Sequence, residues 1–333
     1  KIFESATVDT NILLFSKENN KHKVISVVLN KQNKDSVKNL SVFVEQNYTI
    51  CDFSASESWV VLSPIEESIK CKIKAAGTPL KDWNIQIYRG ILTGCNEAFI
   101  ISTEKRDEIL ANCQSTEEKQ RTAELIRPIL RGRDIKRYGY KWADLWLIAT
   151  FPSRHYNIEM FPSVKESLLS YGIERLEQTG NNHIINGKMI KSRKKTNNKW
   201  FETQDSISYW DLFFKPKICW KAVGKNLAFA IVKSGTFLTA PASFISANDN
   251  NDIILAYLCS SLGKYYIYQN SDTTGAGDIM LNIQSLIRFP IPQNASKTLL
   301  LSIQEKDEIK IDNAIFNLYD FNEDEINYIK GYI

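Results

Sequence analysis

Residues 124–138, with the sequence ELIRPILRGRDIKRY, constrain the fold more than any other segment of the chain. Pro128 lacks a backbone donor and Gly132 tolerates a left-handed backbone, so neither favours the interior of a long helix. The five cations of this segment therefore do not line one helical face; they are Arg127, Arg131, Arg133, Lys136 and Arg137. A turn through Gly132 can bring backbone amides and guanidinium groups to one place, which suits a phosphate strand. An ordinary solvated loop is the alternative interpretation.

The charge distribution along the chain is uneven, although the formal net charge is only +4. Residues 127–141 hold six Lys or Arg and one acid, and residues 188–199 hold six Lys or Arg and no acid. Residues 305–333 carry eight acids and three lysines, a net of −5. A positive field in the middle of the chain, followed by an acidic tail, is consistent with a polyanionic partner.

Periodicity and end signals predict an α+β fold in which a mixed-sheet domain is followed by a C-terminal helical region. Ser63 followed by Pro64 indicates the start of a helix that Gly77 ends. The β-rich runs 7–16 and 23–29 predict a hairpin before the main domain. The other expected elements are strands within 84–101, helices at 103–113 and 116–125, a strand at 145–151, a helix at 162–178, an exposed loop at 180–199, strands within 207–232 and a helix at 253–268.

The groups needed for bond chemistry are not evident in the sequence. The three histidines lack metal-ligand spacing, and the six cysteines include no CxxC pair. No phosphate-binding GxxxxGK[ST] loop, no GxSxG nucleophile elbow and no Asn/Asp-Pro-Pro-aromatic motif occurs. We expect no metal or cofactor in this chain and no catalysis by it. Thiols without disulfides, and the lack of a long apolar run, favour a cytoplasmic protein.

Basic residues suggest instead that the chain binds DNA. Besides residues 124–138, the Lys-rich loop 188–199 can follow a groove or backbone, with a disordered solvated insertion as the alternative. Lys215, Lys217, Lys221 and Lys225 would share one face of a strand, with Trp220 toward the core; a plain exposed strand face is the alternative. The predicted DNA contacts are Arg89, Thr93, Arg127, Arg131, Arg133, Lys136, Arg137, Lys191, Arg193, Lys194, Lys195, Lys217, Lys221 and Lys225.

Two motifs in this order carry a resemblance to a known family: GILTGCNEAFII at 90–101 and LIRPILRGRDIKRY at 125–138. KPKI at 215–218 and FPIP at 289–292 fit the same pattern. Over about residues 55–295 the chain resembles the TaqI-like C-terminal specificity domain of type IIG restriction-modification enzymes and related adenine-specific DNA methyltransferases. Residues 1–15 look like the end of the preceding methyltransferase domain.

The resemblance implies a target recognition domain that selects a double-stranded DNA site. It implies residues 1–48 as the hairpin end of a truncated methyltransferase domain with a linker, 49–295 as the specificity domain and 296–333 as a helical extension. The parent would be a site-specific adenine methyltransferase, with or without endonuclease, that uses S-adenosylmethionine, and magnesium if it cleaves. We expect a monomer that contacts DNA and the parent's methyltransferase domain and no membrane. The alternatives are a catalytically active methyltransferase or nuclease fragment and a protein-interaction domain.

Overall fold

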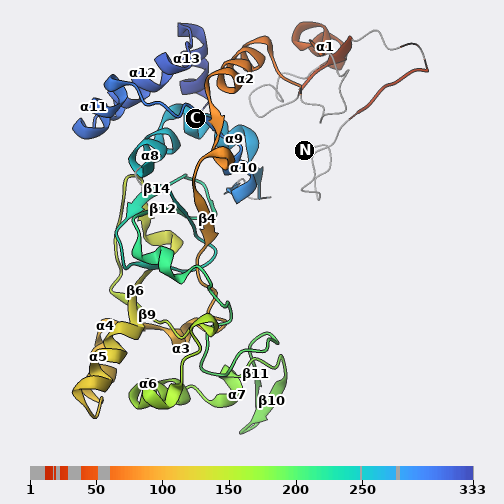
Figure 1. Cartoon of the computed structure of the whole chain (residues 1–333). Helices are drawn as coiled ribbons and strands as arrows, with labels where there is room; N and C mark the ends of the chain where they lie inside the picture. The colour runs from red at the N-terminus through yellow and green to blue at the C-terminus, as the bar shows by residue number, and fades with distance from the viewer. Residues whose placement is uncertain are drawn as a thin grey trace.

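The computed structural model describes residues 12–17, 19, 23–28, 39–51, 61–247, 250–274 and 278–332. These residues form an elongated molecule with three levels (Figure 1). The C-terminal helices lie at the upper end, a four-stranded sheet lies in the middle, and short helices with a projecting hairpin form the lower end. Helices and strands mix throughout, so the predicted α+β class is confirmed.

Most helices are short and lie at the two ends of the molecule. The helices are α1 (Leu40–Asn47), α2 (Pro64–Ala76), α3 (Asn96–Phe99), α4 (Thr103–Ala111), α5 (Thr116–Leu125), α6 (Pro162–Leu169), α7 (Ile173–Leu176), α8 (Asn251–Cys259), α9 (Ser261–Asn270), α10 (Ile283–Ile287), α11 (Lys297–Glu305), α12 (Glu308–Leu318) and α13 (Glu323–Gly331). The 3-10 turns are η2 (Leu80–Asp82), η3 (Gly132–Asp134), η4 (Pro152–Arg154), η5 (Ile158–Met160) and η6 (Trp210–Phe214).

The strands form several small sheets. The strands are β1 (Val24–Ser26), β2 (Thr49–Cys51), β3 (Thr78–Pro79), β4 (Gln86–Arg89), β5 (Ile100–Ser102), β6 (Ile126–Leu130), β7 (Ile135–Lys136), β8 (Gly139–Tyr140), β9 (Leu145–Ile148), β10 (Asn182–Ile185), β11 (Lys188–Lys191), β12 (Lys217–Trp220), β13 (Val223–Gly224), β14 (Phe229–Val232), β15 (Phe237–Leu238), β16 (Ser243–Ser246), β17 (Asp272–Thr273), β18 (Ile279–Met280) and β19 (Pro290–Ile291).

The central sheet has the strand order β14–β12–β16–β4, and all of its pairs are antiparallel. Both faces of β12 are buried, because its side chains alternate between two hydrophobic cores. Ile218 and Trp220 belong to the upper core, whereas Cys219 belongs to the lower core. The expectation that Trp220 points to a core is therefore confirmed. The central sheet thus lies between the two cores and contributes side chains to both.

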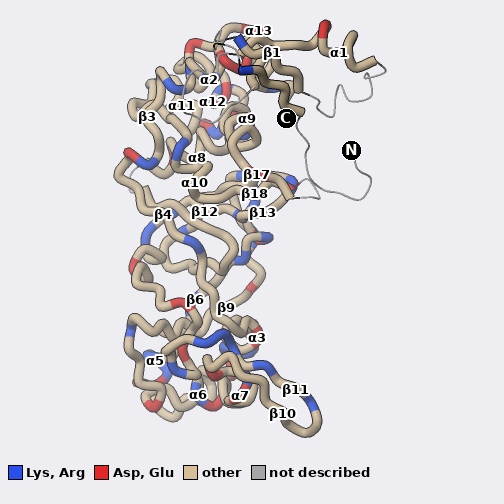
Figure 2. The backbone as a smooth tube through the Cα atoms, turned by 90° about the vertical axis from the view of Figure 1, so that its right-hand side faces the viewer, with Lys and Arg blue, Asp and Glu red and all other residues tan. Residues whose placement is uncertain are grey.

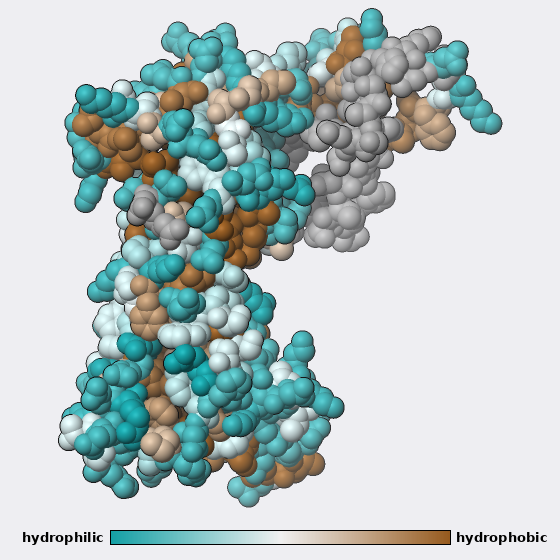
Figure 3. Space-filling model, viewed as in Figure 1, coloured by the Kyte–Doolittle hydropathy of each residue, from teal (hydrophilic) through white to brown (hydrophobic). Residues whose placement is uncertain are grey.

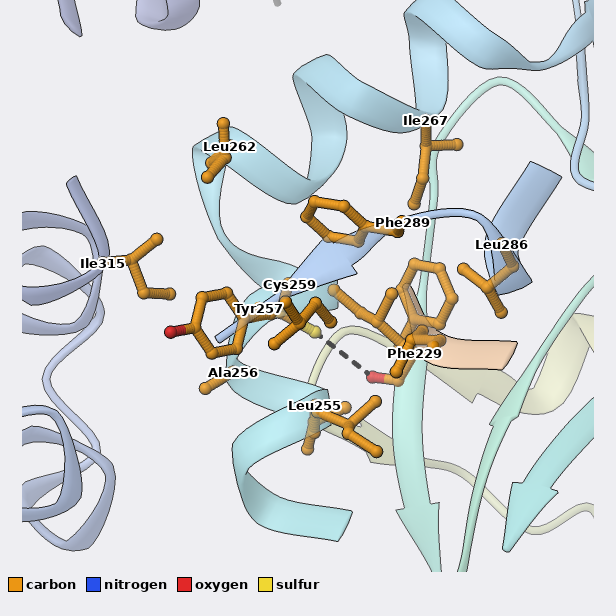
Figure 4. Close-up of a cluster of buried hydrophobic side chains, with 14 of the residues drawn as sticks. Phe229, Leu255, Ala256, Tyr257, Cys259, Leu262, Ile267, Leu286, Phe289 and Ile315 are labelled. Atoms are coloured by element: carbon orange, nitrogen blue, oxygen red, sulfur yellow. Dashed lines mark hydrogen bonds between the residues drawn. The ribbon is translucent and has the colours of Figure 1, made fainter. Parts of the chain in front are cut away.

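The upper core lies between the central sheet and the C-terminal helices. Figure 4 shows Phe229 of β14 beside Tyr257 and Cys259 of α8, with Phe289 and Ile315 in the same cluster. The Cys259 thiol donates to the carbonyl of Phe229 at 3.7 Å. Helices α11, α12 and α13 contribute buried residues to this same core by packing against α8, α9 and α2, so the C-terminal helices belong to it. The domain boundaries expected from the sequence stay predictions.

The lower core is built around a second four-stranded sheet, with the order β15–β6–β9–β5. Strand β6, which carries Pro128, pairs in antiparallel fashion with β9 and in parallel with β15. Helices α4, α5 and α6 pack at the outer end of this sheet (Figure 1). Residues 126–134 therefore form a largely buried strand followed by the turn η3, and the expected break in helical structure is confirmed.

Several predicted element boundaries agree with the structure, and others do not. Helix α2 begins with a capping box between Ser63 and Glu66, as the sequence indicates. The helix expected at 162–178 is interrupted because Gly172 adopts a φ of +84° between α6 and α7. The helix expected at 253–268 is interrupted at Ser260, whose side chain caps α9. Residues 96–99 are helical, although a strand was expected there.

The hairpin expected between 7–16 and 23–29 differs from the structure where it can be compared. Strand β1 pairs with β2, which lies after helix α1. Residues 12–16 form no strand, and residues 1–11 lie outside the described part of the chain. Pairing with a strand far along the sequence cannot be read from two neighbouring β-rich runs, which explains the error.

Candidate nucleic-acid interface

The turn at 131–134 uses its first arginine for structure. Arg131 donates to Asp134 from Nε at 3.0 Å and from a terminal nitrogen at 2.8 Å, and its backbone N–H adds a bond of 2.8 Å. Burial raises the pKa of Asp134, but the hydrogen bonds from Arg131 outweigh this and hold the pKa below its usual value. The neighbouring side chains of Arg133 and Lys136 are exposed. A phosphate could therefore reach Arg133 or Lys136, whereas Arg131 is engaged within the turn.

Two further arginines of this segment are also engaged within the protein. Arg137 forms an ion pair with Glu308 of α12 and donates to the carbonyl of Cys259 at 2.8 Å. The guanidinium of Arg127 lies 5.1 Å from the centre of the Phe214 ring. Lys136 also donates to the carbonyl of Arg133, at 3.1 Å. Four of the five cations therefore have partners within the protein, so they are not presented together as five free phosphate clamps, as was expected.

The lysines around β12 do not share one exposed face. Lys217 is fully buried, and its ammonium donates to the carbonyls of Phe213 at 2.9 Å and Lys215 at 3.2 Å. Burial lowers the pKa of Lys217 to about 8. Lys221 is half-buried because it packs closely against Gly132. A Cβ added to Gly132 would lie 3.0 Å from the Cβ of Lys221. Of the predicted contacts in this set, Lys217, Lys221 and Lys225, only Lys225 is exposed, and burial excludes Lys217 from direct contact with DNA.

Arg193 is a buried hub of the lower end. Its guanidinium donates to four backbone carbonyls, those of Leu176, Thr93, Glu202 and Trp200, at distances of 2.6–2.9 Å. Burial lowers the pKa of Arg193 to about 10. Arg193 was predicted to touch DNA, but with 2% exposure it is a structural residue.

Thr93, also predicted as a DNA contact, is fully buried beside this hub. Its hydroxyl donates to the side chain of Asn96 at 2.7 Å and accepts from the backbone N–H of Cys95. Gly94 follows with a φ of +78°, and a Cβ there would lie 2.8 Å from Cδ of Arg193. The glycine of the GILTGCNE motif is thus required by the close approach of Arg193, and Thr93 acts in the same turn.

The segment after α7 forms a hairpin, where an unstructured loop was expected. Strands β10 and β11 pair in register from Asn182 with Lys191 to Ile185 with Lys188. Asn186 and Gly187 form the turn with φ of +50° and +76°, which matches the two-residue turns that hairpins prefer. The hairpin projects from the lower end of the molecule (Figure 1), and Figure 2 shows Lys and Arg positions on β11.

The base of this hairpin borders an open cavity of about 500 Å³. Lys191, Lys194, Arg175, Gly94 and Met189 are among the residues that line it. Lys191, Lys194 and Lys195, all predicted as DNA contacts, are exposed. We call the exposed side chains of residues 182–195 the hairpin surface. It brings together the predicted cations of the Lys-rich segment, apart from the buried Arg193.

The remaining predicted cations lie elsewhere. Arg89 is exposed on β4, at one edge of the central sheet, and forms an ion pair with Asp205 at 3.2 Å. The turn with Arg133 leads to Tyr138, whose backbone N–H donates to Phe229 of β14 at the opposite edge. A single wall holding every cationic segment is therefore not formed, and the hairpin surface is the strongest local candidate.

Sequence reasoning did not single out Arg175, Ile184 and Met189, all of which belong to the hairpin region. Ile184 is 82% exposed and Met189 is 75% exposed. The signal was present: Asn186-Gly187 lies between two runs with apolar residues, which is typical of a hairpin. The high content of Asn, Lys and Gly in the same segment favoured a loop instead.

No group of three or more His, Cys, Asp or Glu suited to hold a metal ion occurs among the residues that the structure describes. Over the same residues, no helix combines the length and apolar character needed to span a bilayer.

Residues 127–291 match the family model of the TaqI-like C-terminal specificity domain, so this part of the chain is similar to that family. The curated relatives include the type II methyltransferase M.BstVI of Geobacillus stearothermophilus, which is 22% identical over 313 residues. The match covers 90% of this chain and 50% of that relative, so the chain spans about half the relative's length.

Two solved structures show limited similarity over most of the chain. The type IIG restriction endonuclease BpuSI gives a TM-score of 0.46 at 11% identity, with 80% of this chain and 33% of that chain covered. The type IIL restriction-modification enzyme MmeI, solved in complex with DNA, gives a TM-score of 0.46 at 11% identity, with 76% and 35% covered.

Proposed function

We propose that this chain binds double-stranded DNA in a sequence-specific manner, as the target recognition domain of a type IIG restriction-modification enzyme. The family match over residues 127–291 supports the class of function. The hairpin surface supports DNA as the partner, because it lies within the matched segment and carries exposed lysines. Selecting a site needs phosphate contacts that position the domain and side chains that reach base edges.

The observation that carries the proposal is the charge of the segment between Glu177 and Glu202. It contains no acid and six cations, of which all but Arg193 are exposed. These exposed lysines are Lys188, Lys191, Lys194, Lys195 and Lys199. Five ammonium groups without interleaved carboxylates attract a polyanion and release its counterions on binding. A solvated surface with mixed charges would not have this effect.

Catalysis is proposed to belong to a longer parent protein. The relative M.BstVI is described as a methyltransferase, and this chain spans about half of it. We propose that the parent is an adenine-specific methyltransferase, with or without an endonuclease, and that it binds S-adenosylmethionine, and magnesium if it cleaves, outside this chain. The parent's methyltransferase domain is then the second partner of the recognition domain, which is proposed to act as a monomer in the cytoplasm.

The test is a duplex-binding titration of the full chain at several salt concentrations. We expect weak binding to any duplex that decreases steeply with salt, with a log–log slope of about −4 to −5 if about five phosphates are contacted. Binding that is absent at low salt, or independent of salt, would contradict the proposal. Methyl transfer or magnesium-dependent cleavage by this chain alone would favour the alternative of an active fragment. A nuclease-insensitive protein partner would favour an interaction domain.

A further inference from the structure

The two faces of hairpin β10–β11 differ in character. In an antiparallel pair, residues opposite each other point to the same face, and successive pairs alternate. One face carries Asn182, Ile184, Met189 and Lys191, and all four are exposed. We call these four residues the outer face. The other face carries His183, Ile185 and Ile190, which are half-buried, together with exposed Lys188.

The hairpin is held by contacts at its base and on the face that carries His183, opposite the outer face. His183 lies 2.6 Å from Glu177, from ring Nε2 to carboxylate oxygen. The backbone N–H of Ser192 donates to the carbonyl of Asn181 at 2.9 Å, and that of Gly180 donates to Arg193 at 2.9 Å. Because Arg193 is itself locked by four carbonyls, the hairpin has a rigid attachment. None of these contacts uses the outer face.

The outer face nevertheless carries two large apolar side chains. Ile184 and Met189 form a cross-strand pair with exposures of 82% and 75%. Figure 3 shows apolar surface at the lower end of the molecule, over the tip of this hairpin. An exposed apolar pair on a rigid element marks a contact surface when folding does not need it.

The positive charge around the outer face indicates a negatively charged partner. Lys191 lies in the outer face itself, and Lys194 and Arg175 line the adjoining cavity. Arg175 has one carboxylate near it, that of Glu97 at 3.8 Å. A duplex matches such a surface because its phosphates meet the lysines. The major groove is about 12 Å wide and admits a two-stranded β-ribbon.

We propose that the outer face of hairpin β10–β11 enters the major groove and reads base edges. This inference rests on the proposed function and names the residues that determine specificity. Asn182 carries the amide that recognises adenine, Lys191 carries an ammonium that donates to guanine O6 and N7, and Ile184 and Met189 supply the apolar contact that a thymine methyl group prefers. Lys194 and Lys195 follow the strand and contact phosphates.

The experiment selects duplexes from a random pool with the full chain and with four variants. Asn182→Ala, Met189→Ala and Lys191→Ala change the outer face, and Lys188→Ala is the matched control. Lys188 and Lys191 lie on the same strand and are both exposed, but they point to opposite faces. We expect each outer-face variant to lose preference at one or two base positions by about tenfold or more. Lys188→Ala removes one of the five exposed ammonium groups, so it weakens binding to all duplexes alike and keeps the selected sequence.

The outcomes separate the inference from the proposed function. If the unaltered chain selects a sequence and the outer-face variants select the same one, the inference is wrong and DNA recognition stands. If the unaltered chain selects nothing and does not bind duplex, the proposed function fails and the inference fails with it. Sedimentation of the chain without DNA tests whether a second copy of the chain covers the outer face instead. A dimer that Ile184→Ser dissociates would mean that it does, and this would overturn the inference. Thermal melting checks that the exposed substitutions leave the fold intact.

Discussion

The guanidinium of Arg193 donates to the backbone carbonyl of Thr93 at 2.9 Å, across one hundred residues of sequence. Both residues were expected to touch DNA, and both are buried. Their bond joins the GILTGCNE turn to the base of hairpin β10–β11. The GILTGCNE motif and the Lys-rich segment are therefore linked, and the link positions the hairpin surface without being part of it.

Replacing Arg193 should destabilise the chain strongly. Arg193→Met removes the donor from four backbone carbonyls, and buried acceptors without partners cost about 1–3 kcal/mol each. We expect the free energy of unfolding in urea to fall by at least about 3 kcal/mol. Lys194→Met, at the next and exposed position, is the control and should change it by less than about 0.5 kcal/mol. Equal losses of stability in the two variants would contradict the structural role of Arg193.

The buried Lys217 predicts that stability depends on pH in the alkaline range. Its pKa is lowered by burial from 10.5 to about 8, so between these values the unfolded chain binds more protons than the folded chain. Stability should therefore rise with pH from about 8 toward 10.5, by about 1.4 kcal/mol per pH unit from this group. Lys217→Met should lack this contribution. The measurement is the difference in unfolding free energy between the two proteins at pH 7 and 9.5, and a constant difference would contradict it.

Arg131 and Arg133 should behave differently although they are two residues apart. Arg131→Ala removes the charged partner of buried Asp134, and we expect a loss of about 1–3 kcal/mol in stability. Arg133→Ala removes an exposed side chain and should leave stability unchanged. If this arginine contacts phosphate, its loss weakens binding to all sequences alike and makes the salt slope about one unit shallower. Urea unfolding and salt titration of both variants are the measurements. A change in sequence preference alone would contradict the phosphate role.

The ion pair in that turn also predicts behaviour in acid. The pKa of Asp134 lies below its usual value, so its contribution to stability is present above the unfolded pKa and lost as pH falls through the folded pKa. Arg131→Ala should reduce this loss. Unfolding curves of both proteins between pH 7 and 3 measure it, and parallel pH profiles would contradict the assignment.

Paired removal of Lys194 and Lys195 should weaken DNA binding without a change in sequence preference. Both side chains are exposed, and each phosphate contact contributes about 0.9 to the log–log salt slope. We expect the Lys194→Ala, Lys195→Ala variant to bind with a slope less steep by about 2. Lys306→Ala on the C-terminal region is the control for loss of charge. A slope that does not change would remove these lysines from the interface.

The sequence predicts the local elements well where end signals are strong, as at the capping box of α2 and at helices α4 and α5. It cannot predict which cations are free, because that depends on contacts between distant residues. Arg137 pairs with Glu308 of α12, 171 residues away. Lys217 is buried on β12, the strand that contributes to two cores whose residues come from positions 69 to 329. Local charge density singles out residues 188–195, but it cannot show which of their side chains are exposed.

The central sheet limits how the hairpin surface can move relative to the helical end of the molecule. Strand β12 contributes side chains to the upper core from one face and to the lower core from the other. A rotation of either end of the molecule relative to the sheet would therefore disrupt apolar contacts on both faces of the sheet. The hairpin is therefore connected rigidly to the helical end. Under the proposed function, a neighbouring domain that binds the helical end would hold the hairpin at a fixed position along a duplex.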